Sequence, residues 1–242
     1  MGTWTGTTAE ADDTASASGV GDMATASRVG DVTASGVSTV WSVREAPGAT
    51  HRTADELAAV LPMLLAAPRD AGTLELVVRR PRVGHREVLH EGELDVVLGL
   101  VGDSWSQRPS SRTADGGPHP DMQLNVMSAP LVGFLAGAPG RRALAGDQLY
   151  LDLDLSHDNL PAGSRLTIGD PALRFAVIEV TAQPHTGCAK FVERFGAEAM
   201  RFVNGAVGRP LRLRGLNARV VVPGRVRPGD PVTVTRRGAV DE

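Results

Sequence analysis

The only cysteine of this 242-residue chain, Cys188, lies in the stretch PHTGCAKFVERFG, two positions before the only lysine, Lys190. Every other long cation of the chain is one of 24 arginines. The thiolate is the form of cysteine that acts as a nucleophile or a metal ligand, and a neighbouring cation favours it. The pair therefore predicts a reactive thiol, with Cys188 and Lys190 as candidate catalytic residues and Cys188 also as a candidate metal ligand.

The residues after Cys188 predict the helix that would position this thiol. Apolar side chains recur at steps of four, four and three along one helical face, at Phe191, Phe195, Ala199 and Phe202. Pro184 and Gly187 come just before, so we expect the helix to begin close to Cys188, with Thr186 as its cap. The positive end of the helix dipole, Lys190 and His185 would then all lower the thiol pKa.

A structural interpretation of Cys188 remains open beside the reactive one. Free cysteine is among the most buried residue types, and a cysteine on an apolar stripe can be a core residue. The two interpretations differ in whether the thiol reaches solvent.

Basic residues follow the thiol. From His185 to Arg227 the chain has nine Lys or Arg residues and two acidic ones. Arg209, Arg212 and Arg214 alternate with Pro and Leu, so in an extended segment they would share one side. Guanidinium groups in such an array suit phosphate or another oxyanion, and a solvated arginine face is the alternative. We do not expect nucleic acid as the partner, because three Trp, one Tyr and five Phe give few aromatic side chains on which bases could stack.

Composition sets broader limits. Hydrophobic residues make up 42% of the chain and charged residues 22%, as in an ordinary globular protein. No apolar run approaches the ~20 residues of a membrane span, and no secretory signal is evident, so we expect no membrane partner. A single cysteine permits no internal disulfide, which favours a cytoplasmic location.

The chain divides into a tail and one domain. Of the first 40 residues, 26 are Ala, Gly, Ser or Thr, so we expect residues 1–50 to be a disordered tail. We expect residues 51–242 to form a single domain. It starts at a capping box, TADE, with Thr53 as N-cap and Glu56 three residues later. The helix that follows should bend or restart at Pro62.

The rest of the domain is predicted to be mainly β with a few short helices. Alternating strands are expected over 72–81 and 147–156, a strand leading into a helix at Ser128, and two strands around a turn at Gly169. Many short strands with Pro-Gly and Gly-Asp turns are typical of a β-barrel or sandwich. No Walker loop, Rossmann fingerprint or Gly-x-Ser-x-Gly elbow is present.

Several motifs together resemble the MOSC domain family, named for the C-terminal domain of molybdenum cofactor sulfurases. They are NLPAGSRLTIG, HTGCAKF with its single cysteine, the RFG after it, ARVVVPGRVRPGDPV, and upstream GLVGDSW and DGGPHPDMQLNVM. The resemblance covers about 95–236. The family's His-Gly-Gly reads here as Asp115-Gly116-Gly117, and its Pro-Cys reads as Gly187-Cys188.

This resemblance implies a strongly bent, MOSC-like β-barrel with helices at one end. It implies that Cys188 carries sulfur or meets the molybdenum of a pterin cofactor, the molybdenum cofactor, with Lys190 beside it. The residues expected to bind that cofactor are His185, Arg209, Arg212, Arg214, Gly116, Gly117 and Asp121.

Three interpretations of the function remain open, and the first follows from the resemblance. The first is a reductase of N-hydroxylated substrates or a sulfur carrier, which would need an electron-transfer partner or a cysteine desulfurase as sulfur donor. The second is a non-catalytic module that delivers a ligand or cofactor, and an RNA-binding barrel is a weaker third. Pyridoxal phosphate is not expected, because the only lysine is better used as a cation beside the thiol than as a neutral Schiff-base amine.

Overall fold

The structure, a computed structural model, describes residues 27–29, 40–42 and 51–236. The predicted tail therefore lies outside the described residues, apart from strands β1 (Ser27–Val29) and β2 (Val40–Ser42), and it remains a prediction. These two strands pair with each other, and β2 pairs with β4 (Glu87–Leu89).

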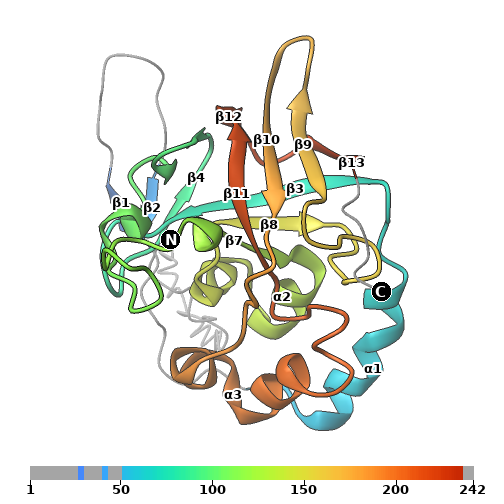
Figure 1. Cartoon of the computed structure of the whole chain (residues 1–242). Helices are drawn as coiled ribbons and strands as arrows, with labels where there is room; N and C mark the ends of the chain where they lie inside the picture. The colour runs from blue at the N-terminus through green and yellow to red at the C-terminus, as the bar shows by residue number, and fades with distance from the viewer. Residues whose placement is uncertain (1–26, 30–39, 43–50, 237–242) are drawn as a thin grey trace, which may run out of the picture.

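Seven strands close into a barrel (Figure 1), because β3 pairs with β13 on one side and with β8 on the other. Around the barrel the order is β3 (Ala71–Arg79), β13 (Pro231–Arg236), β9 (Arg165–Asp170), β10 (Arg174–Val180), β11 (Leu216–Val222), β7 (Leu124–Ser128) and β8 (Leu149–Asp152). Neighbours are antiparallel except β7 and β8, which are parallel. The predicted fold class, mainly β with a bent barrel and a few short helices, is confirmed.

A smaller sheet and several helices complete the fold. Strands β12 (Gly224–Val226), β5 (Gly92–Asp95) and β6 (Gly99–Leu100) form a separate three-stranded sheet. Figure 1 shows α1 (Ala54–Leu65), α2 (Ala129–Ala136) and α3 (Ala189–Asn204) gathered beneath the barrel. Three short 3-10 helices lie in connections: η1 (Ser104–Gln107), η2 (Pro120–Met122) and η3 (Pro139–Ala145).

Strands β3 and β8, which pack against the helices, have buried side chains on both faces. In β8, Leu149 and Leu151 point into the barrel core, whereas Tyr150 joins a second core between barrel and helices. In β3 the pairing with β8 shifts register between Leu74 and Leu76, so the buried side chains of the two strands point toward the barrel core and the second core at matching positions. The second core also contains the buried residues of α3, so the barrel end fixes where that helix lies.

Local signals predicted where helices α1 and α2 begin. Thr53 and Glu56 form the expected capping box, and Ser128 caps α2 by accepting from the Leu131 N–H at 3.3 Å. One helix continues through Pro62, so the expected restart there is wrong. The turn expected at Gly169 to Pro171 lies at residues 171–173 between β9 and β10, and Gly169, with a φ of 100°, is still paired in β9 with Phe175.

Closure between β3 and β8 depends on Gly72. A Cβ placed on Gly72 would lie 1.9 Å from the backbone oxygen of Asp152, so a side chain there pushes β8 away. We expect Gly72→Ala to lower the free energy of unfolding by about 1–3 kcal/mol, measured by urea denaturation. Gly133→Ala, where a Cβ meets nothing within 4 Å, is the matched control and should keep or raise stability. An unchanged midpoint for Gly72→Ala would mean that closure tolerates a wider gap.

Candidate functional site

Cys188 stands at the N-terminus of α3 and is exposed. It is the N-cap residue, although its side chain makes no capping hydrogen bond, so the expectation of Thr186 as cap is wrong. The loop before it is held close to the far end of the helix. The Gly187 N–H donates to Asn204 Oδ1 at 3.1 Å, and a Cβ on Gly187 would lie 2.4 Å from Met200 Sδ.

The helix behind Cys188 is broken at Gly196, which has φ 89° and ψ 164°. The first helical run, 189–195, is thus short, and the dipole acting on the thiol is that of seven residues rather than sixteen. Its buried face consists of Phe191 and Phe195, continued by Ala199 and Val203. Val203 replaces the expected Phe202, which is only partly buried, because the break shifts the register of the second run.

Aromatic contacts fix the first run against the barrel. The rings of Phe191 and Phe195 lie 5.0 Å apart between centroids, and Arg214 Cζ lies 5.0 Å from the centroid of Phe191. A guanidinium over an aromatic face is attracted by the ring quadrupole. Arg214 therefore connects the helix that carries Cys188 to the ion pair below it.

That ion pair centres on Asp147, which is fully buried. Arg214 Nη1 donates to Asp147 Oδ2 at 2.8 Å, and His185 Nε2 lies 2.6 Å from Asp147 Oδ1. Arg214 also donates to the backbone oxygen of Ala145 at 3.2 Å. The carboxylate of Asp147, which lies just before β8, thus binds both the loop of His185 and the segment of Arg214.

The pKa values in this cluster follow from burial and charge. Burial alone would raise the pKa of Asp147, but Arg214 and His185 overcome it and lower the pKa. Burial, with help from Arg214, lowers the pKa of His185 despite the contact with Asp147. Because a lowered pKa favours neutral imidazole, His185 donates its Nε2 proton to the carboxylate at neutral pH.

Cys188 lies on the wall of a pocket of about 600 Å³, which we call the cationic pocket. Its basic lining residues come from five separate parts of the chain: Arg80, Arg86, Arg108, Lys190, Arg194 and Arg214. His185, Thr186, Asn125 and Phe191 also line it, and none of the described residues that line it is acidic. Such a lining favours an anionic ligand.

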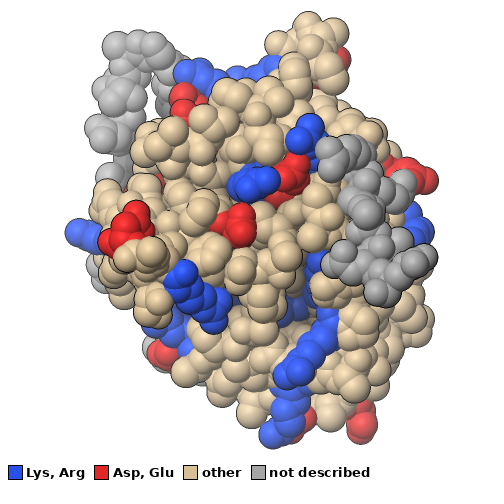
Figure 2. Space-filling view, viewed as in Figure 1, with Lys and Arg blue, Asp and Glu red and all other residues tan. Residues whose placement is uncertain are grey.

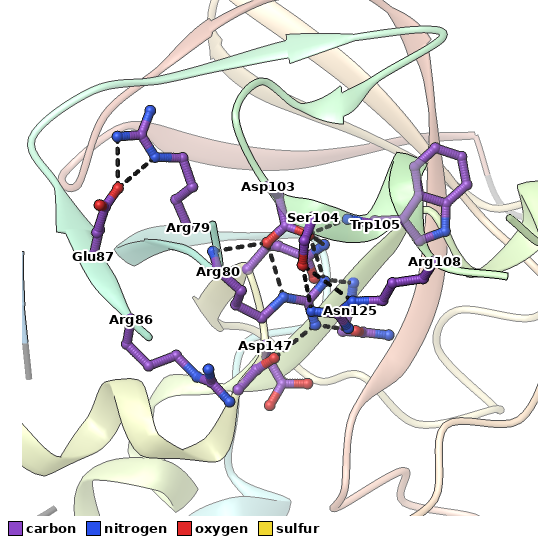
Figure 3. A network of polar contacts seen from close by, with 12 residues as sticks. Arg79, Arg80, Arg86, Glu87, Asp103, Ser104, Trp105, Arg108, Asn125 and Asp147 are labelled. Atoms are coloured by element: carbon purple, nitrogen blue, oxygen red, sulfur yellow. Dashed lines mark hydrogen bonds and ion pairs between the residues drawn. The ribbon is translucent and has the colours of Figure 1, made fainter. Parts of the chain in front are cut away.

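Arg80 and Arg214 are neutralised by carboxylates of the described residues. Arg80 donates from Nε to Asp103 Oδ2 at 2.8 Å and from Nη2 to Asp103 Oδ1 at 2.9 Å, and it also binds Asn125 and the Gly146 carbonyl. Figure 3 shows this network, with Arg80 surrounded by its partners. Arg214 is paired with Asp147. These two groups organise the pocket without adding a free charge to it.

Arg86 is different. Its side chain is buried, with 8% of the residue exposed, and it pairs with no carboxylate among residues 51–236. Its Nη1 donates to the backbone oxygen of His85 at 2.7 Å, while its Nε has no partner among the described residues. In Figure 3 no dashed line joins Arg86 to the other residues drawn, whereas Arg79 is paired with Glu87. Burial first, and then the charges of Arg194 and Arg80, lower the pKa of Arg86 to about 10.

A second pocket, of about 420 Å³, lies on the other side of His185 and Arg214. Both residues line the two pockets, whereas Arg209 and Arg212 line the second pocket and are absent from the lining of the cationic pocket. Arg212 donates to the backbone oxygen of Leu160 at 2.6 Å and contacts His157 Nδ1 at 3.0 Å. Arg212 has a φ of 47°, so the segment is turned rather than extended, and the expected single arginine face does not form.

The remaining predicted binding residues lie elsewhere. Gly116 and Gly117 belong to a loop closed by Asp115 Oδ1, which accepts from the Gly117 N–H at 2.9 Å. Asp121 Oδ1 lies 3.6 Å from Arg219 Nη1. None of the three lines either pocket. Their binding role stays a prediction.

The sequence analysis gave no site role to Arg80, Arg86, Arg108 or Asp147, and it included Arg194 only in the RFG motif and in the basic segment after the thiol. For Arg80 and Arg86 the only signal was the repeated placement of arginine after strand β3, which by itself predicts no pocket. Among the described residues no cluster of three or more His, Cys, Asp or Glu is arranged to hold a metal ion. Within residues 51–236, no helix has the length and apolar character needed to cross a membrane. Figure 2 shows basic side chains interspersed with acidic and uncharged ones on the face drawn.

Comparison with known proteins gives structural neighbours only. No family model matches the sequence, and no curated protein matches it. The YuaD protein of Bacillus subtilis is 16% identical, with a TM-score of 0.49 over 67% of this chain and 94% of its own. YiiM of Escherichia coli is 21% identical, with a TM-score of 0.44 over 69% and 72% of the two chains. We take no functional role from either protein.

The buried carboxylate gives a pH-dependent prediction. The folded state binds fewer protons than the unfolded state at both Asp147 and His185, so stability should rise with pH and be lost in acid. At neutral pH we expect Asp147→Asn to cost about 3–5 kcal/mol, because Arg214 remains buried without its partner. The difference from wild type should shrink as the pH falls below about 4, because Asp147 of the unfolded wild-type chain takes up a proton there and the folded carboxylate, with its lowered pKa, does so only at still lower pH.

Urea denaturation at neutral and acidic pH measures this difference. Asp158→Asn is the matched control, since Asp158 pairs with Arg69 at the surface with 80% of its side chain exposed. It should leave stability close to wild type at both pH values. A difference between wild type and Asp147→Asn that does not depend on pH would contradict the charged assignment of Asp147.

Proposed function

We propose that this chain is a MOSC-type protein whose cationic pocket holds the phosphate of a molybdopterin-type cofactor beside Cys188. In this proposal Cys188 carries sulfur or ligates the molybdenum. The observation that supports it is the position of the only thiol of the chain on the wall of a pocket whose lining, among the described residues, has six basic side chains and no acidic one. The sequence resemblance to MOSC domains adds the identity of the ligand.

The residues present fit such a cofactor. Arg86 provides a buried guanidinium whose Nε is unpaired, as a phosphate site requires. Cys188 is exposed and supplies a soft sulfur donor, and a metal there would bring its other ligands with it, since no described cluster supplies them. When bound, the molybdenum centre would supply the oxygen and electron chemistry that reduction of an N-hydroxylated substrate requires.

The chain's own residues would then act by position and charge. Asp147 and Arg214 hold the wall that carries Cys188, and His185 presents neutral imidazole between the two pockets. Lys190, exposed two residues after the thiol, adds a cation at the mouth of the pocket. Reduction would need an electron-transfer partner, and sulfur carriage would need a donor such as a cysteine desulfurase.

The two pockets can be separated by mutation. We expect the full-length protein purified from a molybdenum cofactor-producing host to retain molybdenum and pterin, and Arg86→Gln to reduce both by about tenfold or more. Arg212→Gln, in the second pocket, should retain them, because the phosphate is assigned to the pocket of Cys188. Metal analysis and pterin fluorescence measure retention, and melting temperature reports folding of both variants.

Loss of retention in Arg212→Gln but not in Arg86→Gln would move the phosphate to the second pocket and contradict the assignment. Wild-type protein without molybdenum or pterin would leave the non-catalytic ligand-delivery module as the better interpretation. Bound RNA in place of pterin would favour an RNA-binding barrel.

Lys190 gives a further prediction. If its role is a charge beside the thiol, Lys190→Arg should keep the alkylation rate of Cys188, whereas Lys190→Met should slow it. Alkylation by a neutral reagent, followed by mass spectrometry, measures both rates. Borohydride reduction that attaches pyridoxal to Lys190 would contradict this role, because Schiff-base chemistry uses the neutral amine.

A further inference from the structure

Two guanidinium groups of the cationic pocket converge on one point. A Cβ placed on Gly146 would lie 3.2 Å from Arg86 Nη2 and 3.7 Å from Arg194 Nη1. Gly146 has a φ of 86°, which favours glycine, so the space between the two groups stays open. Arg194 also donates to the Leu144 carbonyl at 2.8 Å, and this contact fixes its direction.

Arg86 gives this point the character of an anion site. It is buried, it pairs with no carboxylate in residues 51–236, and its Nε is unsatisfied. Burial of a guanidinium beside another guanidinium is unfavourable, and an oxyanion between them would relieve both the desolvation and the repulsion. The anion site and the only thiol of the chain share the same pocket.

We propose that the cationic pocket binds a thiosulfonate, of which thiosulfate is the simplest, and that Cys188 accepts its outer sulfur to form a persulfide. The proposal rests on the proposed function, because it uses the same thiol and the same pocket. It goes further by naming a small anionic donor, so that Cys188 could be loaded without a protein sulfur donor.

Thiosulfonate chemistry matches the lining better than phosphate alone. The thiol gives the pocket a nucleophile, which an inorganic phosphate does not use. In a thiosulfonate, the electrophilic outer sulfur is two bonds from the sulfonate oxygens that guanidinium groups bind. Arg86 and Arg194 would hold the oxygens, and the exposed Cys188 would meet the outer sulfur.

The step balances without another reagent. The Cys188 thiolate attacks the outer sulfur, a new S–S bond forms, and the bond to the sulfonate sulfur breaks. Its electron pair leaves with sulfite, so the cysteine sulfur is oxidised and the sulfonate sulfur is reduced. Negative charge accumulates on the departing sulfite, where the converging guanidiniums stabilise it.

The experiment uses the full-length, reduced protein with thiosulfate. We expect one equivalent of sulfite, a mass gain of one sulfur atom located on Cys188, and thiocyanate on addition of cyanide. Cys188→Ser should show none of these. Arg86→Gln should slow sulfite release by about tenfold or more, the size of one charge-assisted hydrogen bond, while Arg201→Gln, at an arginine with 67% of its side chain exposed, should match wild type.

A purely structural effect of Arg86→Gln is detected separately. Alkylation of Cys188 by neutral iodoacetamide should be the same in wild type and Arg86→Gln, because no anion has to bind. If no sulfur is transferred, or if Arg86→Gln and wild type release sulfite equally fast, the proposal is wrong. Retention of molybdenum and pterin by a protein that fails this test would leave the proposed function standing and overturn only the thiosulfonate step.

Discussion

The buried carboxylate of Asp147 is the interaction on which the site depends. It binds Arg214 at 2.8 Å and His185 at 2.6 Å, and so joins three segments that the barrel alone would not hold together. Arg214 in turn packs on Phe191, in the first turn of the helix that begins after Cys188. Loss of a buried ionic partner costs about 3–5 kcal/mol. That is a large fraction of the ~5–15 kcal/mol that stabilises a typical domain.

The same cluster explains why charge is uneven in the cationic pocket. Asp147 neutralises Arg214 and Asp103 neutralises Arg80, so both arginines serve the fold. Arg86 is buried and has no such carboxylate in the part of the chain that the structure describes. A fold selected only for stability would replace or pair this group, because an isolated buried charge is costly. Its retention is what a binding site for an anion requires.

Sequence reasoning was most successful where the signal is local. The capping box at Thr53, the cap at Ser128 and the turn after Gly169 each depend on neighbouring residues, and together the short strands predicted a barrel. Lys190 and His185 were found near Cys188 for the same reason. The pairing of β3 with β8 that closes the barrel could not be predicted, because it joins Leu74 to Leu151, 77 positions later in the chain.

The site was only partly predictable because its cations converge from distant segments. Arg86 and Arg194 meet beside Gly146 only after barrel and helices have packed, and although Arg194 belongs to the RFG motif, nothing in that motif indicates Arg86 as its neighbour. The segment of Arg209 to Arg214 was predicted to be extended from its alternation. It turns instead, with a φ of 47° at Arg212, and its arginines take different partners in the folded chain.

The central claim is that the Cys188 thiol faces a pocket that attracts anions. The most direct measurement compares its alkylation by anionic iodoacetate with that by neutral iodoacetamide, in the folded protein and in the urea-unfolded protein. We predict a higher ratio of iodoacetate to iodoacetamide rate constants in the folded state, and a decrease of that ratio in Arg86→Gln and at high salt. A folded-state ratio equal to or below that of the unfolded chain would contradict the account.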